Sequence, residues 1–481
     1  MTYRLEHDSL GEVKVPQDVY YGAQTKRALD NFPVSGEKNH PLLIKAYLIL
    51  KKACALTNAE LGVLDKKRSK AIIHGCDELI SDRYTEQIVI DKYQAGAGTS
   101  LNMNINEVIA NIALERLGYK KGNYDYLSPN DHVNMSQSTN DTFPTASHIA
   151  LIWNTQELIG SLVLLVKSLH KKAAAFKHLL KSGRTHLQAA VPVTLGQEFF
   201  AYEETIKKSI SMLRHISEPV NPSKYPFPSL LEVAIGGTAV GTGLNTPKYY
   251  RDTVIKNLNK ATGLNLIKSA DPREALQSRI AISRMSSTIH DIALELIRIA
   301  NDLRLLSSGT ITGIGEINLP AVQPGSSIMP GKANPVMAEA LNMICFRVIG
   351  NALTVSMAEQ AGQLELNVMM PVMINTLLES IDILKNFIPV FARKAVDGIT
   401  VNKDRLDYYF KNTPSIATIL NPIIGYLKAA EVVKQSISEK RPVTDIIIEK
   451  GLMGKKELDG LLKSDRITGI LDNERNKHAS N

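Results

Sequence analysis

Residues 272–306 read PREALQSRIAISRMSSTIHDIALELIRIANDLRLL. Apolar side chains recur in this stretch at alternating spacings of three and four residues, at Ile282, Met285, Ile289, Ile292, Leu296, Ile299, Leu303 and Leu306. After Pro272 the stretch contains neither proline nor glycine, so the spacing predicts one continuous helix with an apolar stripe along its length. At about 1.5 Å per residue, this helix would be about 50 Å long.

Two further stretches carry the same periodicity. One stripe contains Ile152, Ile159, Leu162, Val166, Leu169, Ala173 and Phe176, and the other contains Met370, Met373, Leu377, Ile381, Leu384 and Ile388. Pro371 is expected near the start of the latter helix or at a bend. Helices of this length need apolar partners along their whole length. The sequence therefore predicts a mainly α fold with a long central helix bundle, either shared between subunits or formed within one chain.

The remainder of the chain reads as shorter helices and loops. Residues 42–61 and 101–117 are the clearest short helices, and Asp397-Gly398 marks a break before a further helix start at Pro442 to Asp445. The polar tail is expected to fray. We expect three domains: a mixed loop and helix domain (1–141), a long-helix bundle domain (142–396) and a small C-terminal helical domain (397–481).

The composition of the chain limits the kinds of protein that it can be. The 481-residue chain is 44% hydrophobic and 22% charged, as is typical of a globular protein. It has no uninterrupted apolar run of about 18 residues, and its first residues lack the apolar core of a signal peptide. The three cysteines are far apart and form no CxxC pair. They predict neither a disulfide framework nor a zinc site, and a cytoplasmic location fits best.

The formal net charge of +8 suits either nucleic acid or an acidic small molecule. However, the lysines are spread among acids, and aromatic residues make up only 6% of the chain, with no basic stripe interleaved with aromatics. Lysine pairs such as Lys51-Lys52 and Lys171-Lys172 are therefore interpreted as solvated faces. We expect no nucleic-acid or membrane partner, and the charge would help a dicarboxylate approach.

The most polar candidate loop is GSSIMPGKANP, residues 325–335. Its glycines and prolines argue against uninterrupted helix or strand, so a loop is predicted. Ser326, Lys332 and Asn334 could together bind a small anion, with the lysine as a point charge and the amide as an orienting donor. A surface turn would also have this composition.

Three other segments offer similar chemistry. In GAGTSLNMN, residues 96–104, glycines precede Thr99 at a helix N-terminus, where anions are stabilised, although an ordinary helix cap would look the same. Residues 129–141 carry hydrogen-bonding side chains at ten of thirteen positions, as a binding or a capping loop would. In residues 182–192, His186 suits proton transfer or contact with an amine, although a lone histidine is often structural. No metal-ligand spacing and no GxSxG motif occurs, so no metal or cofactor is predicted.

In this order, the motifs GAGTSLNMNINEV, SPNDHVNMSQSTNDTFPTA, GRTHLQAAVPVTLGQEF, GGTAVGTGLN and GSSIMPGKANP resemble those of the aspartase/fumarase superfamily, over about residues 10–460. The resemblance implies a three-domain helical subunit, a homotetramer with a shared helix bundle, and active sites built from loops of three subunits. It also implies a cofactor-independent anti elimination that yields fumarate through an aci-carboxylate intermediate. Preorganised hydrogen-bond donors must stabilise that intermediate.

The resemblance also assigns roles to residues. Ser326 would be the base, and it must be an alkoxide or nearly one when it acts, which neighbouring N–H groups and Lys332 can favour. The carboxylate that accumulates charge would be held by Thr99, Ser138, Thr139 and Ser327. The other carboxylate would be held by Thr185, Lys332 and Asn334. The leaving group would lie near Asn140 and His186, with Glu339 paired to the histidine.

Two branches of the superfamily remain in competition, the ammonia-lyases that act on L-aspartate and the class II fumarases. GAGTS, SQSTND and QPGSSIMPGKANPVMAE favour the ammonia-lyases, whereas Gly236-Gly237-Thr238 leans towards the fumarases. The chain departs from the usual pattern at Ala189, at Thr310-Ile311 and at Ala333, so a different substrate is possible. A non-catalytic helical oligomer that binds dicarboxylates is a further alternative.

Overall fold

The computed structural model describes residues 2–218, 228–309 and 311–464. Most of these residues lie in helices, and the strands among them form small two-stranded sheets, which confirms the mainly α class. The chain divides into two compact units made of discontinuous segments. Unit 1 comprises residues 1–159, 211–293 and 346–384, and unit 2 comprises residues 160–210, 294–345 and 385–481. The three-domain division stays a prediction, and the polar tail and Thr310 lie outside the described residues.

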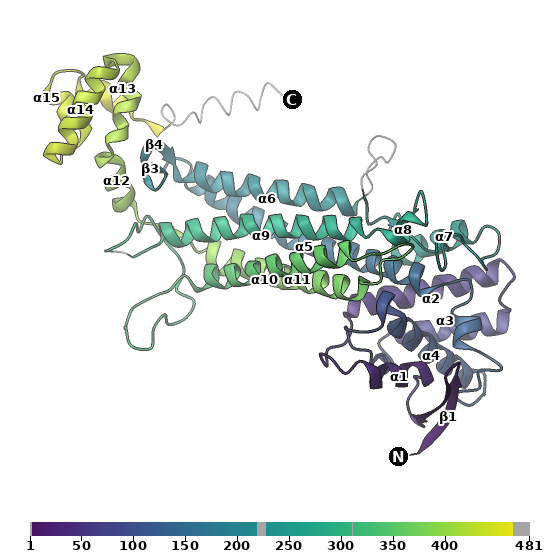
Figure 1. Cartoon of the computed structure of the whole chain (residues 1–481). Helices are drawn as coiled ribbons and strands as arrows, with labels where there is room; N and C mark the ends of the chain where they lie inside the picture. The colour runs from purple at the N-terminus through teal and green to yellow at the C-terminus, as the bar shows by residue number, and fades with distance from the viewer. Residues whose placement is uncertain (1, 219–227, 310, 465–481) are drawn as a thin grey trace. The chain divides into compact units, whose positions relative to one another are not determined.

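Unit 1 opens with an antiparallel hairpin of β1 (Tyr3–Asp8) and β2 (Gly11–Pro16). Its helices include α1 (Ala23–Asn31), α2 (Pro41–Glu60), α3 (Lys66–Ile80), α4 (Thr99–Arg116) and α7 (Tyr250–Thr262). Helix α2 packs against α3 and α7, and α3 packs against α4 (Figure 1). The remaining elements are the 3-10 turns Thr85–Gln87 and Gly96–Gly98, the π-turn Pro129–Val133, and the parallel pair β5 (Glu232–Val233) and β6 (Ile267–Lys268). Helices α2 and α4 confirm the two predicted short helices.

Five long helices contribute segments to both units: α5 (Thr139–Ala175), α6 (Leu195–Ser217), α9 (Ile280–Leu306), α10 (Val336–Gln360) and α11 (Met370–Phe391). Helices α5, α9 and α11 confirm the three predicted long helices. The predicted α9 stripe is buried, with every member between 0 and 6% exposed. Burial of these side chains is the main stabilising contribution that the helices make.

The predicted start of the longest stripe at Pro272 is wrong. A short helix α8 (Glu274–Gln277) ends at Ser278, whose backbone is extended, and α9 begins at Ile280. The Ser278 hydroxyl accepts a hydrogen bond from the Ile280 N–H at 3.2 Å, so a serine cap competes with continuous helix at this point.

Unit 2 contains the antiparallel pairs β3 (Leu180–Thr185) with β4 (Gln188–Thr194) and β7 (Ile317–Asn318) with β8 (Thr400–Val401). After the π-turn Ala392–Val396 come α12 (Lys403–Asn412), the 3-10 turn Pro414–Ile416, α13 (Ala417–Ile424), α14 (Tyr426–Glu439), α15 (Val443–Glu449) and α16 (Lys455–Leu461). The start of α15 confirms the helix predicted after Pro442. The last helices share a core that includes Ile416, Leu420, Val432, Val443, Ile446 and Leu458.

Two helices among the described residues, α5 and α10, are apolar enough over 18 residues to cross a membrane by length and composition. Within the chain, 56% of that window is buried in α5 and 33% in α10. A core helix meets the same criterion, so the two helices are a weak indication of a membrane span.

Candidate active site

The N-terminus of α4 lies against the start of α5 in unit 1. Gly98 has a φ of +84°, and a Cβ there would lie 2.0 Å from a ring carbon of Phe143. Only glycine combines this backbone conformation with so close an approach. Thr99 is consequently held at the first position of α4 with its side chain exposed, where the helix N-terminus favours an anion.

Hydrogen bonds join this helix start to the other predicted donors of unit 1. The Asn102 amide donates to the Thr139 hydroxyl at 3.0 Å, and the Asn140 N–H donates to the Ser138 hydroxyl at 3.2 Å. The Asn140 amide donates to the Ala239 carbonyl at 2.7 Å, which ties the segment to the glycine-rich loop that follows β5. Unit 1 therefore brings Ser138, Thr139 and Asn140 together with the helix that carries Thr99.

Asp141, which is not among the predicted site residues, organises this cluster. Its buried carboxylate accepts hydrogen bonds from the N–H groups of Ser138 (3.0 Å), Gly236 (2.9 Å) and Thr238 (2.9 Å). Burial raises the pKa of Asp141 to about 6, while the three N–H bonds oppose that rise. Its position directly after SQSTN was the available signal, but no pattern in the sequence links it to residues 236–238.

The interpretation of the Lys51-Lys52 pair as a solvated face is wrong for Lys51, which is buried. Lys52 forms a surface ion pair with Asp77, whereas Lys51 is 0% exposed and donates to the Asn134 and Gln137 side chains at 3.0 and 2.9 Å. Burial lowers the pKa of Lys51 to about 8. Neighbouring positions on a helix point in different directions, so adjacent lysines need not share an environment. Lys51 thus supports the polar segment that ends in Ser138 and Thr139.

In unit 2, the β3–β4 hairpin presents Thr185 and His186. His186 and Leu187 form its two-residue turn with φ of 54° and 59°, a conformation that non-glycine residues adopt at a cost. Thr185 and His186 are both exposed. Strand β3 of the hairpin is held by Glu316, which is 0% exposed and forms ion pairs with Lys181 at 2.7 Å and Arg184 at 2.8 Å.

The loop predicted at residues 325–335 is confirmed, and its geometry centres on Ser326. The Ser326 Oγ accepts hydrogen bonds from the N–H groups of Ile328 (3.3 Å) and Met329 (3.0 Å). The Asn334 amide donates to the Gly325 carbonyl at 2.6 Å, so one of its donors closes the loop. Residues 321–326 and 329–333 line a cavity of about 480 Å³ here. Ser327 and Lys332 are exposed, and Glu339 lies in the first turn of α10.

Within the described part of unit 2, no hydrogen bond or ion pair joins the hairpin residues Thr185 and His186 to Ser326, Lys332 or Glu339. The structure therefore positions each predicted residue on its own local scaffold. The histidine–glutamate pair stays a prediction. The described residues also hold no group of three or more His, Cys, Asp or Glu side chains that could bind a metal ion.

Comparisons with known proteins show the family to which the chain belongs. Residues 11–350 match a lyase family, and residues 416–469 match the C-terminal domain of fumarase C. The chain belongs to the aspartase/fumarase superfamily of lyases. It is 44% identical to aspartate ammonia-lyase of Helicobacter pylori strain J99 over 96% of this chain and 97% of that protein, and 44% identical to that of Escherichia coli K12 over 95% and 94%.

Solved structures of superfamily members share the fold. A fumarate lyase:delta crystallin from Brucella melitensis, bound to cobalt, has a TM-score of 0.90 at 42% identity, covering 97% of this chain and 99% of that one. A class II fumarase from Schistosoma mansoni has a TM-score of 0.89 at 35% identity, covering 96% and 98%. Identity is thus higher with these ammonia-lyases than with this fumarase, as the motifs predict.

Proposed function

We propose that this lyase is an aspartate ammonia-lyase, which eliminates ammonia from L-aspartate to give fumarate. The observation that carries the proposal is the environment of Ser326, whose Oγ lies within hydrogen-bond distance of two backbone N–H groups. A serine hydroxyl is a weak base, and donors aimed at its oxygen stabilise the alkoxide that can remove a proton. The relatives named aspartate ammonia-lyase supply the substrate.

In the proposed reaction, Ser326 removes the Cβ proton of L-aspartate, next to the β-carboxylate. The electron pair moves into that carboxylate and gives an aci-carboxylate with two negative charges on its oxygens. The pair then returns to form the double bond of fumarate as the C–N bond breaks and the amine leaves. Hydroxyl and amide donors that are fixed before the reaction stabilise the charge without reorganisation.

The remaining residues divide between the two ends of the substrate. The β-carboxylate is assigned to Thr99, Ser138, Thr139 and Ser327, and the other carboxylate to Thr185, Lys332 and Asn334. The helix start at Thr99 and the cationic Lys332 are both suited to anions. Asn140 and His186 are assigned to the amine, with Glu339 holding the histidine in the required tautomer.

We infer that the active form is a homotetramer whose active sites combine segments of different subunits. Helix α10 carries four large apolar side chains on one face that are more than half exposed, Met343, Phe346, Leu353 and Met357. A long apolar helix face of this kind is suited to helix packing between subunits. Because α10 is exposed there, association would bury a face that this chain leaves open. A cytoplasmic location also stays our inference, from cysteine usage.

Formation of fumarate, followed by its absorbance, tests the proposal directly. The purified protein is mixed with L-aspartate and, separately, with L-malate. Fumarate from L-aspartate at a rate well above that from L-malate is expected. Fumarate mainly from L-malate would favour the second candidate, a class II fumarase. The similarity of the fold to the class II fumarase from Schistosoma mansoni, at 35% identity, supports this candidate. No fumarate from either substrate would favour a non-catalytic dicarboxylate-binding oligomer.

A further inference from the structure

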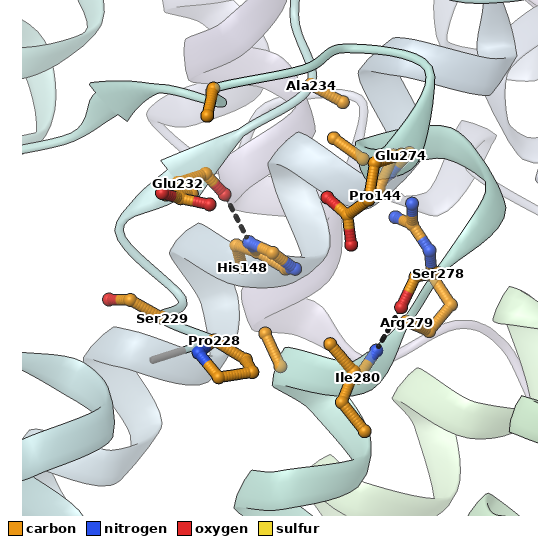
Figure 2. Close-up of a pocket in the computed structure, with 13 residues that line it drawn as sticks. Pro144, His148, Pro228, Ser229, Glu232, Ala234, Glu274, Ser278, Arg279 and Ile280 are labelled. Carbon is orange, nitrogen blue, oxygen red and sulfur yellow. Dashed lines mark hydrogen bonds between the residues drawn. The ribbon is translucent and has the colours of Figure 1, made fainter. Parts of the chain in front are cut away.

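Unit 1 contains a second cavity, of about 310 Å³, built from other residues than those assigned to the reaction (Figure 2). Its apolar wall comes from α5, from the segment around β5 and from residues 270–281, and consists of Pro144, Ala234, Ala270, Ala275, Ile280 and Ala281. The polar lining includes His148, Glu232, Glu274 and Arg279. A cavity of this size, mostly apolar with a few polar groups, suits a small molecule.

Arg279 is the unusual member of the lining. Its side chain is almost entirely buried, since the residue is 2% exposed, yet its Nε and Nη2 have no hydrogen-bond partner among the described residues. Its Nη1 reaches only the sulfur of Met370, at 3.9 Å, which is a weak acceptor. Burial lowers the pKa of Arg279 to about 10. The charges of Glu359 and Glu274 act on this guanidinium, yet two of its donors have no hydrogen-bond acceptor among the described residues, and buried donors are rarely left without one.

His148, another residue of the polar lining, supplies a hydrogen-bond acceptor to the cavity. Its Nδ1 lies 2.8 Å from the Glu232 carbonyl oxygen, which can only accept, so Nδ1 carries the hydrogen. Burial, followed by the charge of Arg279, lowers the pKa of His148 to about 4, so the ring is neutral at pH 7 and its Nε2 is an acceptor. Figure 2 shows this nitrogen on the ring edge away from Glu232, with the Glu274 carboxylate on the same side of the cavity.

The cavity therefore offers a guanidinium with free donors, a neutral imidazole acceptor and two carboxylates. We propose that it binds an α-amino acid with a small apolar side chain, whose carboxylate accepts from Arg279 Nε and Nη2. The ammonium group donates to His148 Nε2 and to Glu274, and the side chain lies against the alanines and Pro144. Glu232 and Glu274 repel a second carboxylate, so L-aspartate is excluded. This inference does not depend on the proposed function.

The test uses isothermal titration calorimetry of L-alanine into the full-length protein at pH 7. Saturable binding of L-alanine is expected, whereas propionate, which lacks the ammonium, and methylammonium, which lacks the carboxylate, should bind at least about tenfold more weakly. Saturating succinate, a dicarboxylate suited to the reaction site, should not displace L-alanine. Displacement by succinate, or an absence of L-alanine binding, would overturn the proposal.

Arg279→Met is the matched variant, because methionine fills similar space without the charge. L-Alanine binding should weaken by about 100-fold through loss of two charge-assisted hydrogen bonds. The urea midpoint should change little, since the variant removes two buried donors without acceptors together with the attraction of the guanidinium to Glu359 and Glu274. A structural arginine would behave oppositely, with lower stability and unchanged binding, and that result would refute the assignment. Glu274→Gln, at an exposed position, gives a second variant in which binding should fall by about tenfold, and unchanged binding there would contradict the ammonium contact.

Discussion

The two regions that carry the proposed chemistry are built in opposite ways. In unit 1, the donors Ser138, Thr139 and Asn140 belong to a network with a buried carboxylate, Asp141, and a close helix contact at Gly98. In unit 2, the Ser326 loop is partly exposed and is ordered by short-range bonds between its own residues. Under the proposed assignment, the substrate contacts of unit 1 rely on the packed fold, whereas activation of the base relies on a local turn.

The largest effect should come from Ser326→Ala. We expect kcat to fall by about 10³-fold, or about 4 kcal/mol in activation free energy, because the base is removed. The urea midpoint should not change, since the side chain bonds only within its loop. Steady-state kinetics and denaturation of the same preparation check both parts. Undiminished turnover would contradict the assignment of Ser326 as the base.

A pair of glycine variants sharpens the comparison. Gly98 and Gly331 have similar φ values, +84° and +77°, but an added Cβ meets Phe143 at 2.0 Å in the first case and nothing within 4 Å in the second. Gly98→Ala should therefore cost roughly 3–4 kcal/mol of unfolding free energy, from both backbone strain and overpacking. Gly331→Ala should cost about 1 kcal/mol, from strain alone. If urea denaturation gave the same loss of unfolding free energy for both variants, the contrast between a packed region at Gly98 and an open loop at Gly331 would be contradicted.

A smaller effect is expected in the packed region alone, where His148 should make the free energy of unfolding depend on pH. The pKa of His148 is about 4 in the folded chain and 6.5 ordinarily, so between these values the unfolded state binds the extra proton. The contribution of His148 to the free energy of unfolding is therefore fully present above pH 6.5 and is lost as the pH falls towards 4. Between pH 7 and pH 4.5 the loss should be about 2.5 kcal/mol. In His148→Gln this component should be absent, and urea denaturation of both proteins at the two pH values measures the difference. Identical pH dependence would show that His148 is not the group that titrates.

The same contrast explains what could be predicted from the sequence. Periodic apolar spacing locates α5, α9 and α11, and glycine and proline locate the Ser326 loop, because these signals are local. Apolar spacing does not predict helix α10, because this helix has apolar residues such as Leu341 and Phe346 on both its buried and its exposed faces. The roles of Asp141 and Lys51 depend on residues about 80 to 100 positions away, and no local pattern encodes such contacts.

The central claim is that the packed region and the base loop complete one active site across subunits. Ser326→Ala and Asn140→Ala are each expected to lose most of their activity alone, because each lacks a residue assigned to the reaction. The two variants are denatured together in equal amounts and refolded, and fumarate formation from L-aspartate is measured. If different subunits supply the two regions, some sites receive both intact segments, and activity should return to about a quarter of the wild-type value. A mixture that stays as inactive as the separate variants would contradict the account.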